Sequence, residues 1–169
     1  MSGLRAFIDD SGSGGELPWF VLAGYLGTVE AWDAFDAPWR NVLDRPPKLD
    51  YFKHSEVYGP RWEGMSTTER NERVDAFIKV IGNHALRSIY VRLRQQDYDE
   101  VIKPYIPPMW RNAYYFLFIG FLSAATMTAK HLGDGNRIEF FFDSNREVEK
   151  PIKDALRTSG ALTAIPRPG

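Results

Sequence analysis

Apolar residues in this chain recur with two different periods, one typical of strands and the other of helices. Leu4, Ala6 and Ile8 occupy every second position up to Asp9, which predicts a strand. A glycine-rich turn connects it to an apolar run from Trp19 to Gly27, so we expect an antiparallel hairpin. Alternation returns from Arg87 to Arg94. Residues 137–143 are apolar at nearly every position, which predicts a strand buried on both faces.

Segments with helical spacing separate these strands. The first predicted helix is capped by Thr28 and ends at the Arg-Pro-Pro-Lys segment 45–48. The second begins at a capping box formed by Ser66 and Glu69. Its apolar face comprises Val74, Phe77, Ile78 and Ile81. A short helix is expected within 96–103.

The segment from Asn112 to Ala129 contains no charged residue and approaches the roughly 20 residues that a membrane-spanning helix needs. Hydroxyl residues make its second half less apolar, and no second segment like it exists in the chain. We therefore predict a buried central helix rather than a membrane span. Asp9 and Asp10 interrupt the apolar region that a signal peptide requires, so the predicted location is the cytoplasm, with no membrane partner.

Strands separated by helices after an initial hairpin predict an α/β fold with a mixed sheet. The chain has 169 residues, which suits a single domain over 1–169. Lys plus Arg number 21 and Asp plus Glu number 22, which excludes a strongly basic protein that coats nucleic acid. The absence of cysteine excludes disulfides, zinc–thiolate sites and cysteine nucleophiles. A polar helix at 146–158 precedes a strand that begins at 161 and stops before Pro166, so we expect a C-terminally shortened chain.

Two of the predicted strands end in aspartate. Asp9 closes the first strand and Asp143 closes the strand at 137–143, and a serine follows each within two residues. Ligands bind beyond the carboxyl ends of strands in α/β sheets, so parallel neighbours would bring both carboxylates to one edge. Two carboxylates that lie close together repel unless a proton or a divalent cation relieves them, and oxygen ligands favour Mg²⁺ or Mn²⁺. The alternative is that each aspartate caps the turn after it.

The segment from Tyr51 to Gly59 places Lys53, His54 and Glu56 among aromatic residues, outside any long regular element. Loops of this kind often carry function. Glu56 could supply a further oxygen ligand, and His54 could act as a ligand, a general base or a phosphate contact. The alternative is a surface loop that is anchored by its aromatic residues Tyr51, Phe52 and Tyr58.

Other polar residues are weaker candidates. Asp10 follows Asp9 directly and should face the opposite side of the strand, where it would support the site or the turn. Arg92 and Arg94 share one strand face, either near a phosphate path or simply in solvent. Further supporting or substrate contacts are expected from Ser11, Lys53 and Glu147.

These segments, taken in order, resemble the domain-of-unknown-function family numbered 3800. The similarity rests on Phe7-Ile-Asp-Asp-Ser-Gly12, Leu22-Ala-Gly24, Tyr51-Phe-Lys-His-Ser-Glu56 and Phe142-Asp143, and it covers nearly the whole chain. The resemblance implies a ribonuclease-H-like fold, with a mixed β-sheet flanked by α-helices. It also implies a metal-dependent nuclease activity with Asp9, Glu56 and Asp143 as metal ligands. The Leu-Gln-x-Ala-Asp motif that family members carry further on does not occur here, so its acidic residue is absent or replaced by Glu147 or Glu149.

Residues and resemblance together predict hydrolysis of phosphodiester bonds in nucleic acid, either DNA or RNA. Two Mg²⁺ or Mn²⁺ ions about 4 Å apart would be held by carboxylates. Asp9 would bridge the ions, and His54 or Lys53 would contact phosphate. The alternative is a catalytically silent binding or assembly module with the same fold. The sequence leaves the oligomeric state open, a homodimer included.

Overall fold

The structure is a computed structural model that describes residues 3–12, 17–108, 111–132 and 137–142. The chain divides into two compact units. The first, here called the sheet unit, comprises Met1–Thr28 and Arg87–Gly169. The second, here called the helical unit, is the intervening segment Val29–Leu86. Each unit is described by itself.

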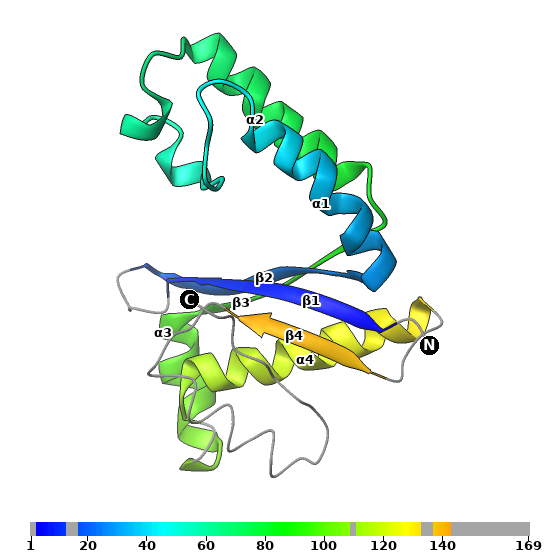
Figure 1. The fold of residues 1–169 in the computed structure, drawn as a ribbon. Helices are drawn as coiled ribbons and strands as arrows, with labels where there is room; N and C mark the ends of the chain where they lie inside the picture. The colour runs from blue at the N-terminus through cyan, green and yellow to red at the C-terminus, as the bar shows by residue number, and fades with distance from the viewer. Residues whose placement is uncertain (1–2, 13–16, 109–110, 133–136, 143–169) are drawn as a thin grey trace. The chain divides into compact units, whose positions relative to one another are not determined.

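The sheet unit contains a four-stranded sheet with the strand order β3-β2-β1-β4. Its strands are β1 (Leu4–Ser11), β2 (Trp19–Thr28), β3 (Arg87–Arg94) and β4 (Ile138–Phe142). β1 pairs antiparallel with β2, which pairs antiparallel with β3, whereas β4 runs parallel to β1 (Figure 1). This arrangement confirms the predicted hairpin and the predicted α/β fold, with a mixed β-sheet and flanking helices.

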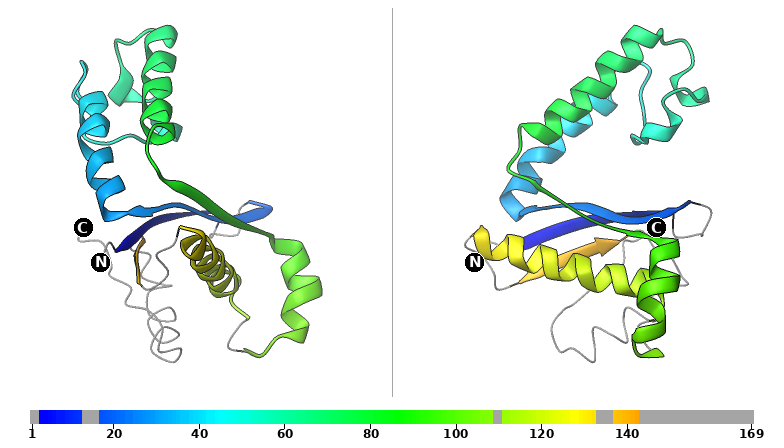
Figure 2. Two further views of the ribbon diagram at one scale, coloured as in Figure 1. Left: turned by 90° about the vertical axis from the view of Figure 1, so that its right-hand side faces the viewer. Right: turned by 180° about the vertical axis from the view of Figure 1, so that it is seen from behind.

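One face of the sheet is covered by α4 (Ala113–His131), which lies along it in the views of Figures 1 and 2. The alternation in β1 directs Leu4, Ala6 and Ile8 to this face, where each is at most 5% exposed. Side chains from β2, β3, β4 and α4 complete the core, among them Phe20, Leu22, Ile89, Phe118, Phe121 and Phe140. Each fully buried apolar side chain of this size stabilises the unit by about 1.5–3 kcal/mol.

The prediction of a buried central helix is confirmed for one face of α4, where eight residues from Tyr114 to Ala129 are buried, whereas Met127 on the other face is 62% exposed. The Asn112 side chain caps its N-terminus by accepting hydrogen bonds from the backbone N–H groups of Tyr114 and Tyr115. The Thr126 and Thr128 hydroxyls donate to backbone carbonyl oxygens four residues earlier, so the hydroxyl groups in its second half are satisfied within the helix. Among the described segments, no helix combines the length and the apolarity that crossing a bilayer demands.

The prediction that the last strand is buried on both faces is wrong. Ile138 and Phe140 of β4 are buried beneath α4, but Glu139 and Phe141 on the other face are only half-buried. The face opposite α4 carries its own contacts, because Phe141 stacks on Phe7 with ring centroids 4.7 Å apart. Beside them, Arg5 Nε donates to Glu139 Oε2 at 3.3 Å.

The helical unit contains α1 (Val29–Leu43) and α2 (Thr67–Gly82), which lie side by side in both figures. Two short 3-10 helices, η1 (His54–Glu56) and η2 (Pro60–Trp62), lie between them in sequence. The core of the unit comprises Val42, Leu49, Val57, Trp62 and Phe77. Strand β2 continues through Thr28, so the first helix begins at Val29.

The capping box at the start of α2 is confirmed. The Ser66 N–H donates to Glu69 Oε2 at 2.7 Å, and the Glu69 N–H donates to Ser66 Oγ at 3.3 Å. The Ser66 hydroxyl also donates to Glu69 Oε2 at 2.7 Å. This hydrogen bond, together with the one from the Ser66 N–H, lowers the pKa of the Glu69 carboxyl below its usual value. The placement of Ile78 on the buried face is wrong, because the buried residues of α2 are Arg73 and Phe77 and Ile78 is 58% exposed.

The short helix predicted within 96–103 is present as three consecutive turns. They are α3 (Gln95–Asp97), the π-helical η3 (Tyr98–Ile102) and the 3-10 helix η4 (Lys103–Tyr105). Tyr98 is buried and its ring meets that of Phe116, which ties this segment to α4. The polar helix predicted at 146–158 and the strand predicted from 161 lie outside the described residues.

Candidate functional site

Asp9 lies near the carboxyl end of β1, on the sheet face opposite α4, and its side chain is exposed. Its Oδ1 accepts a hydrogen bond from the Asp10 N–H at 2.9 Å, a local contact of the kind that turn-capping aspartates make. Asp10 faces the opposite side of the strand, as predicted, and is half-buried. Ser11 is exposed on the same face as Asp9.

Two glycines allow close backbone packing near Asp9, one in the turn after β1 and one on the neighbouring strand β2. Gly12 has a φ of +80°, and a Cβ atom there would collide with the carbonyl oxygen of Trp19. Gly24 pairs with Ile8, and a Cβ atom there would collide with the backbone of Phe7 and Ile8. Both glycines belong to the motifs that the sequence singles out, and both allow close backbone approach at the carboxylate.

The two aspartates act electrostatically on a buried phenol. Burial raises the pKa of the Tyr114 hydroxyl, and the negative charges of Asp10 and Asp9 raise it further. Tyr114 is 6% exposed at the N-terminal end of α4, where its ring contacts Phe20. The end of β1 therefore carries negative charge on both faces, one side facing solvent and the other facing this phenol.

The register of β1 and β4 decides what lies next to Asp9. The parallel ladder pairs Leu4 with Ile138 and continues to Ile8 with Phe142. Asp9 and Asp143 are the next residues in the sequence after that last pair. Asp143 and Glu147 themselves lie outside the described residues.

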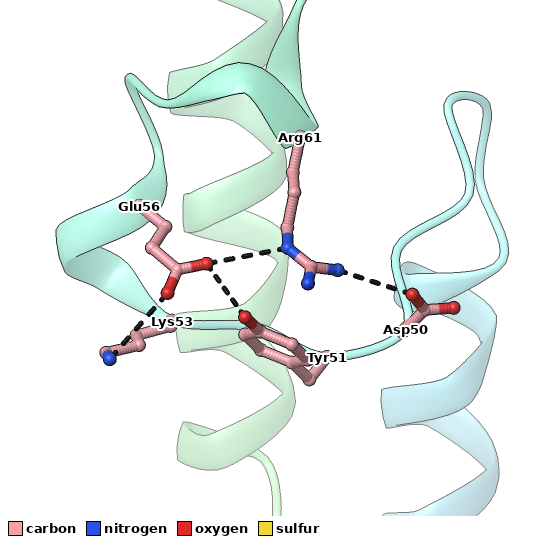
Figure 3. A network of polar contacts seen from close by, with 5 residues as sticks. All are labelled: Asp50, Tyr51, Lys53, Glu56 and Arg61. Carbon is pink, nitrogen blue, oxygen red and sulfur yellow. Dashed lines mark hydrogen bonds and ion pairs between the residues drawn. The ribbon is translucent and has the colours of Figure 1, made fainter.

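Glu56 lies in the helical unit, in a network of polar contacts that Figure 3 shows. Its Oε2 accepts a hydrogen bond from the Tyr51 hydroxyl at 3.0 Å and lies 3.7 Å from Arg61 Nε. Its Oε1 lies 3.6 Å from Lys53 Nζ. Arg61 also pairs with Asp50 at 3.3 Å, and its guanidinium stacks 4.5 Å from the Tyr51 ring centroid. Two cations thus compensate the charge of Glu56.

The aromatic residues of this segment divide between the core and the surface. Phe52 stacks on Phe77 with ring centroids 4.3 Å apart and contacts Trp39 and Trp62. Tyr58 is 72% exposed, so the expectation that it anchors the loop is wrong, and the buried neighbour Val57 takes that role. His54 begins η1 and is exposed. The loop is therefore held by Phe52 and Val57, while Lys53 and His54 remain at its surface.

The described residues bring the candidates together in two groups. Asp9, Asp10 and Ser11 share the end of β1, and Lys53, His54 and Glu56 share one loop of the helical unit. Within ranges 3–12, 17–108, 111–132 and 137–142, no three His, Cys, Asp or Glu side chains form a cluster that could hold a metal ion. The predicted convergence of Asp9, Glu56 and Asp143 stays a prediction.

Arg73 is a buried cation that the sequence pattern did not reveal. It is 3% exposed, and its guanidinium donates to the carbonyl oxygens of Pro47, Val42, Leu43 and Arg45 at 2.7–3.0 Å. Burial lowers its pKa, and the charge of Arg45 lowers it further. Two of its acceptors are in the last turn of α1, where a cation also meets the negative end of the helix dipole. Arg73 thus joins α2 to the end of α1 and the loop after it.

No protein-family model matches the chain, and no curated protein matches its sequence. Among solved structures, the chain is similar to one chain of the PCNA:RNase HII complex from Archaeoglobus fulgidus, with a TM-score of 0.44 and 15% sequence identity. The similarity covers 96% of this chain and 60% of that chain. At this level of similarity no activity or site residue carries over, so the candidate site rests on the residues of this chain alone.

Proposed function

We propose that this chain is a metal-dependent phosphodiesterase that acts on nucleic acid, with Asp9 and Asp143 as the core of its site. The observation that carries the proposal is the parallel pairing of β1 with β4, which ends among the described residues at Ile8 and Phe142. If the ladder continues by one pair, two carboxylates come together at one sheet edge. The ordered motifs that resemble family 3800, with its ribonuclease-H-like fold, support the same proposal.

The donor set fits a hard divalent cation. Asp9 and Asp143 supply only carboxylate oxygens, which Mg²⁺ and Mn²⁺ prefer. Asp9 is exposed and accepts one hydrogen bond from a backbone N–H, so a carboxylate oxygen remains available for a cation. Such an ion, when bound, would activate water and stabilise the leaving oxygen of a phosphodiester. The chain itself would hold the carboxylates in place through the β1–β4 ladder and the close packing at Gly24.

Glu56 enters this proposal as a third ligand, with His54 or Lys53 as a phosphate contact. In the structure the Glu56 carboxylate is paired with Lys53 and Arg61. Service as a metal ligand therefore requires these cations to turn away, and phosphate oxygens of a bound substrate would be suitable new partners for them. Substrate binding and release of Glu56 would then occur together.

The ion pairs of Glu56 also favour the second candidate function, a binding or assembly module without catalysis. Its side chain is one-third exposed and already has two cationic partners and a hydroxyl donor. A carboxylate in that arrangement stabilises its own loop without any metal. Glu56→Gln distinguishes the two functions, because it abolishes hydrolysis only in an enzyme that uses this carboxylate.

The deciding experiment is a cleavage assay on labelled single-stranded and double-stranded DNA and RNA, with Mn²⁺, with Mg²⁺ and with EDTA. We expect cleavage that requires the metal ion. Asp9→Asn and Asp143→Asn should each lower it by about 100-fold or more, since loss of a ligand costs at least as much as loss of a group that only orients one.

Asp99→Asn is the matched control for this assay. Asp99 is an exposed aspartate of the same unit that pairs with Lys103 at 2.7 Å and belongs to neither group of candidate residues, so the substitution removes the same charge from outside the candidate set. Equal activity of wild type, Asp9→Asn and Asp99→Asn would contradict the proposal, and so would the absence of cleavage of every substrate.

A further inference from the structure

The sheet face opposite α4 carries exposed aromatic rings on the two strands furthest from β4. Tyr90 of β3 is 69% exposed, and Trp19 of β2 is 43% exposed. Both point away from α4, because their neighbours Ile89 and Phe20 are buried in the core. Large aromatic side chains left in water on a sheet are the surfaces on which nucleic-acid bases stack.

The same face carries positive charge beside these rings. The Arg92 guanidinium lies 5.0 Å from the Trp19 ring centroid, in the geometry of a cation–π contact. Among the described residues, Arg92 forms no ion pair. Arg94, two residues further on the same face, lies 3.6 Å from Asp97 and is half exposed. Trp19, Tyr90, Arg92 and Arg94 are called the aromatic–arginine face below.

The strand register connects this face with the candidate site. Asp9 pairs with Ala23, and Ala23 pairs with Tyr90, so the aspartate and the tyrosine lie on one row across three strands. The next row carries Ser11, Val21 and Arg92. The backbones of Asp9 and Tyr90 are two strand spacings apart, which corresponds to about 10 Å. A strand of nucleic acid on this face would therefore lie within reach of the Asp9 carboxylate.

We propose that the aromatic–arginine face binds single-stranded nucleic acid. Bases stack on Tyr90 and on Trp19, and phosphates contact Arg92 and Arg94. An unpaired strand is the occupant because stacking on side chains requires the flat side of a base, which a duplex hides within its own stack. The guanidinium groups of Arg92 and Arg94 complement the phosphate backbone, although the whole chain has a net charge of −1.

This inference deepens the proposed function, on which it rests for the chemistry of its substrate. It adds the class of substrate, single-stranded, and the side of the site from which the strand reaches Asp9. Binding to the face needs no metal ion, so binding and hydrolysis can fail separately.

The test is the fluorescence anisotropy of fluorescein-labelled oligo(dT) and oligo(U) with the full chain in EDTA, at several salt concentrations. Tyr90→Ala should raise the Kd by about 5- to 150-fold, which corresponds to about 1–3 kcal/mol for one stacked base. Arg92→Gln should lower the slope of log K against log salt by about 0.7, the value for one phosphate contact on a single strand. A duplex of matched length should bind more weakly than either oligonucleotide.

Two control variants match these substitutions. Tyr105 is 85% exposed in η4, and Tyr105→Ala should leave the Kd unchanged. Arg137→Gln removes one exposed positive charge of the sheet unit from outside the face, and the salt slope should stay as in wild type.

Three results would overturn the inference. One is the absence of oligonucleotide binding by the wild type, and another is an equal Kd for Tyr90→Ala and Tyr105→Ala. The third is an unchanged Kd for Tyr90→Ala together with a lower melting temperature, which would make the face a packing surface for protein. If the oligonucleotides bind and the variants have the expected effects, but no cleavage occurs in Mn²⁺, the binding proposal is supported and only the proposed hydrolysis is contradicted.

Discussion

Ile8 of β1 and Phe142 of β4 form the last described pair of the parallel ladder. Ile8 is buried against α4 and also pairs with Gly24 of β2, so its backbone is held on both sides. Asp9 follows Ile8 directly and is thereby placed at a rigid point of the sheet. This support favours cation binding by the carboxylate, because folding has already restricted its backbone and little further conformational entropy is lost when an ion binds.

We expect Mn²⁺ to raise the melting temperature by about 5–10 °C. At about 100 times its Kd, a bound ion adds about 2.7 kcal/mol, and a chain of this size gains about 2–4 °C for each kcal/mol. Asp143→Asn should remove most of this rise and slightly stabilise the metal-free protein, because it deletes one of two repelling charges. Thermal unfolding followed by circular dichroism measures both effects. An Asp143 that only caps a turn would show no Mn²⁺ effect, and its replacement by Ala would cost about 1 kcal/mol.

Alanine at Gly12 or Gly24 should destabilise the sheet unit by about 1–3 kcal/mol. Gly12 has a positive φ, and a side chain at either position would collide with backbone atoms rather than with a flexible side chain. Gly82→Ala is the matched control, because a Cβ atom there meets nothing within 4 Å, and it should raise stability by about 0.4–1 kcal/mol. Urea denaturation gives the three values, and equal stabilities for the three variants would refute the close approach at Gly12 and Gly24.

Arg73→Met should destabilise the helical unit by about 3–5 kcal/mol. The substitution keeps a long apolar stem but leaves four carbonyl oxygens without their donor in a buried place. Arg40→Met is the control, because Arg40 is exposed and its one ion pair within the described part of the chain is with the exposed Asp36, so its loss should cost no more than about 0.5 kcal/mol. Urea denaturation of both variants tests this, and similar losses would mean that the carbonyl contacts of Arg73 contribute little.

Tyr114 should make the protein less stable at high pH. Its folded pKa lies above the unfolded value of about 10, so the stability that its neutral form contributes is fully present below pH 10. That contribution is lost as the pH rises toward the folded pKa, with a slope of up to about 1.4 kcal/mol per pH unit. Tyr114→Phe should flatten the stability profile above pH 10, while Tyr105→Phe, at an exposed position, should not. The buried Tyr98, whose pKa is also raised, contributes in the same direction in every variant.

Several local features could be predicted from the sequence because they depend on residues that are near one another in the chain. The alternation from Leu4 to Asp9 directs side chains to two faces whatever the partner strands are. The capping box of Ser66 and Glu69 closes within one helical turn. The opposite orientations of Asp9 and Asp10 follow from strand geometry alone. The sequence also marks Gly12 and Gly24 as motif residues, but the backbone collisions that require glycine there depend on how β1 and β2 pack together.

Only the tertiary structure decided which distant residues meet. The Arg5–Glu139 ion pair joins positions 134 residues apart, and no local pattern in either segment predicts that these two residues meet. The residues that compensate Glu56 and the carbonyls that surround Arg73 also depend on how separate turns pack. The row that joins Asp9 to Tyr90 exists only because β1 and β3 both pair with β2 in one register. The local spacing of apolar residues specifies the helices and strands of this protein. The partners of its charged side chains are decided by tertiary packing, because electrostatic interactions depend on distance in space and not on position in the chain.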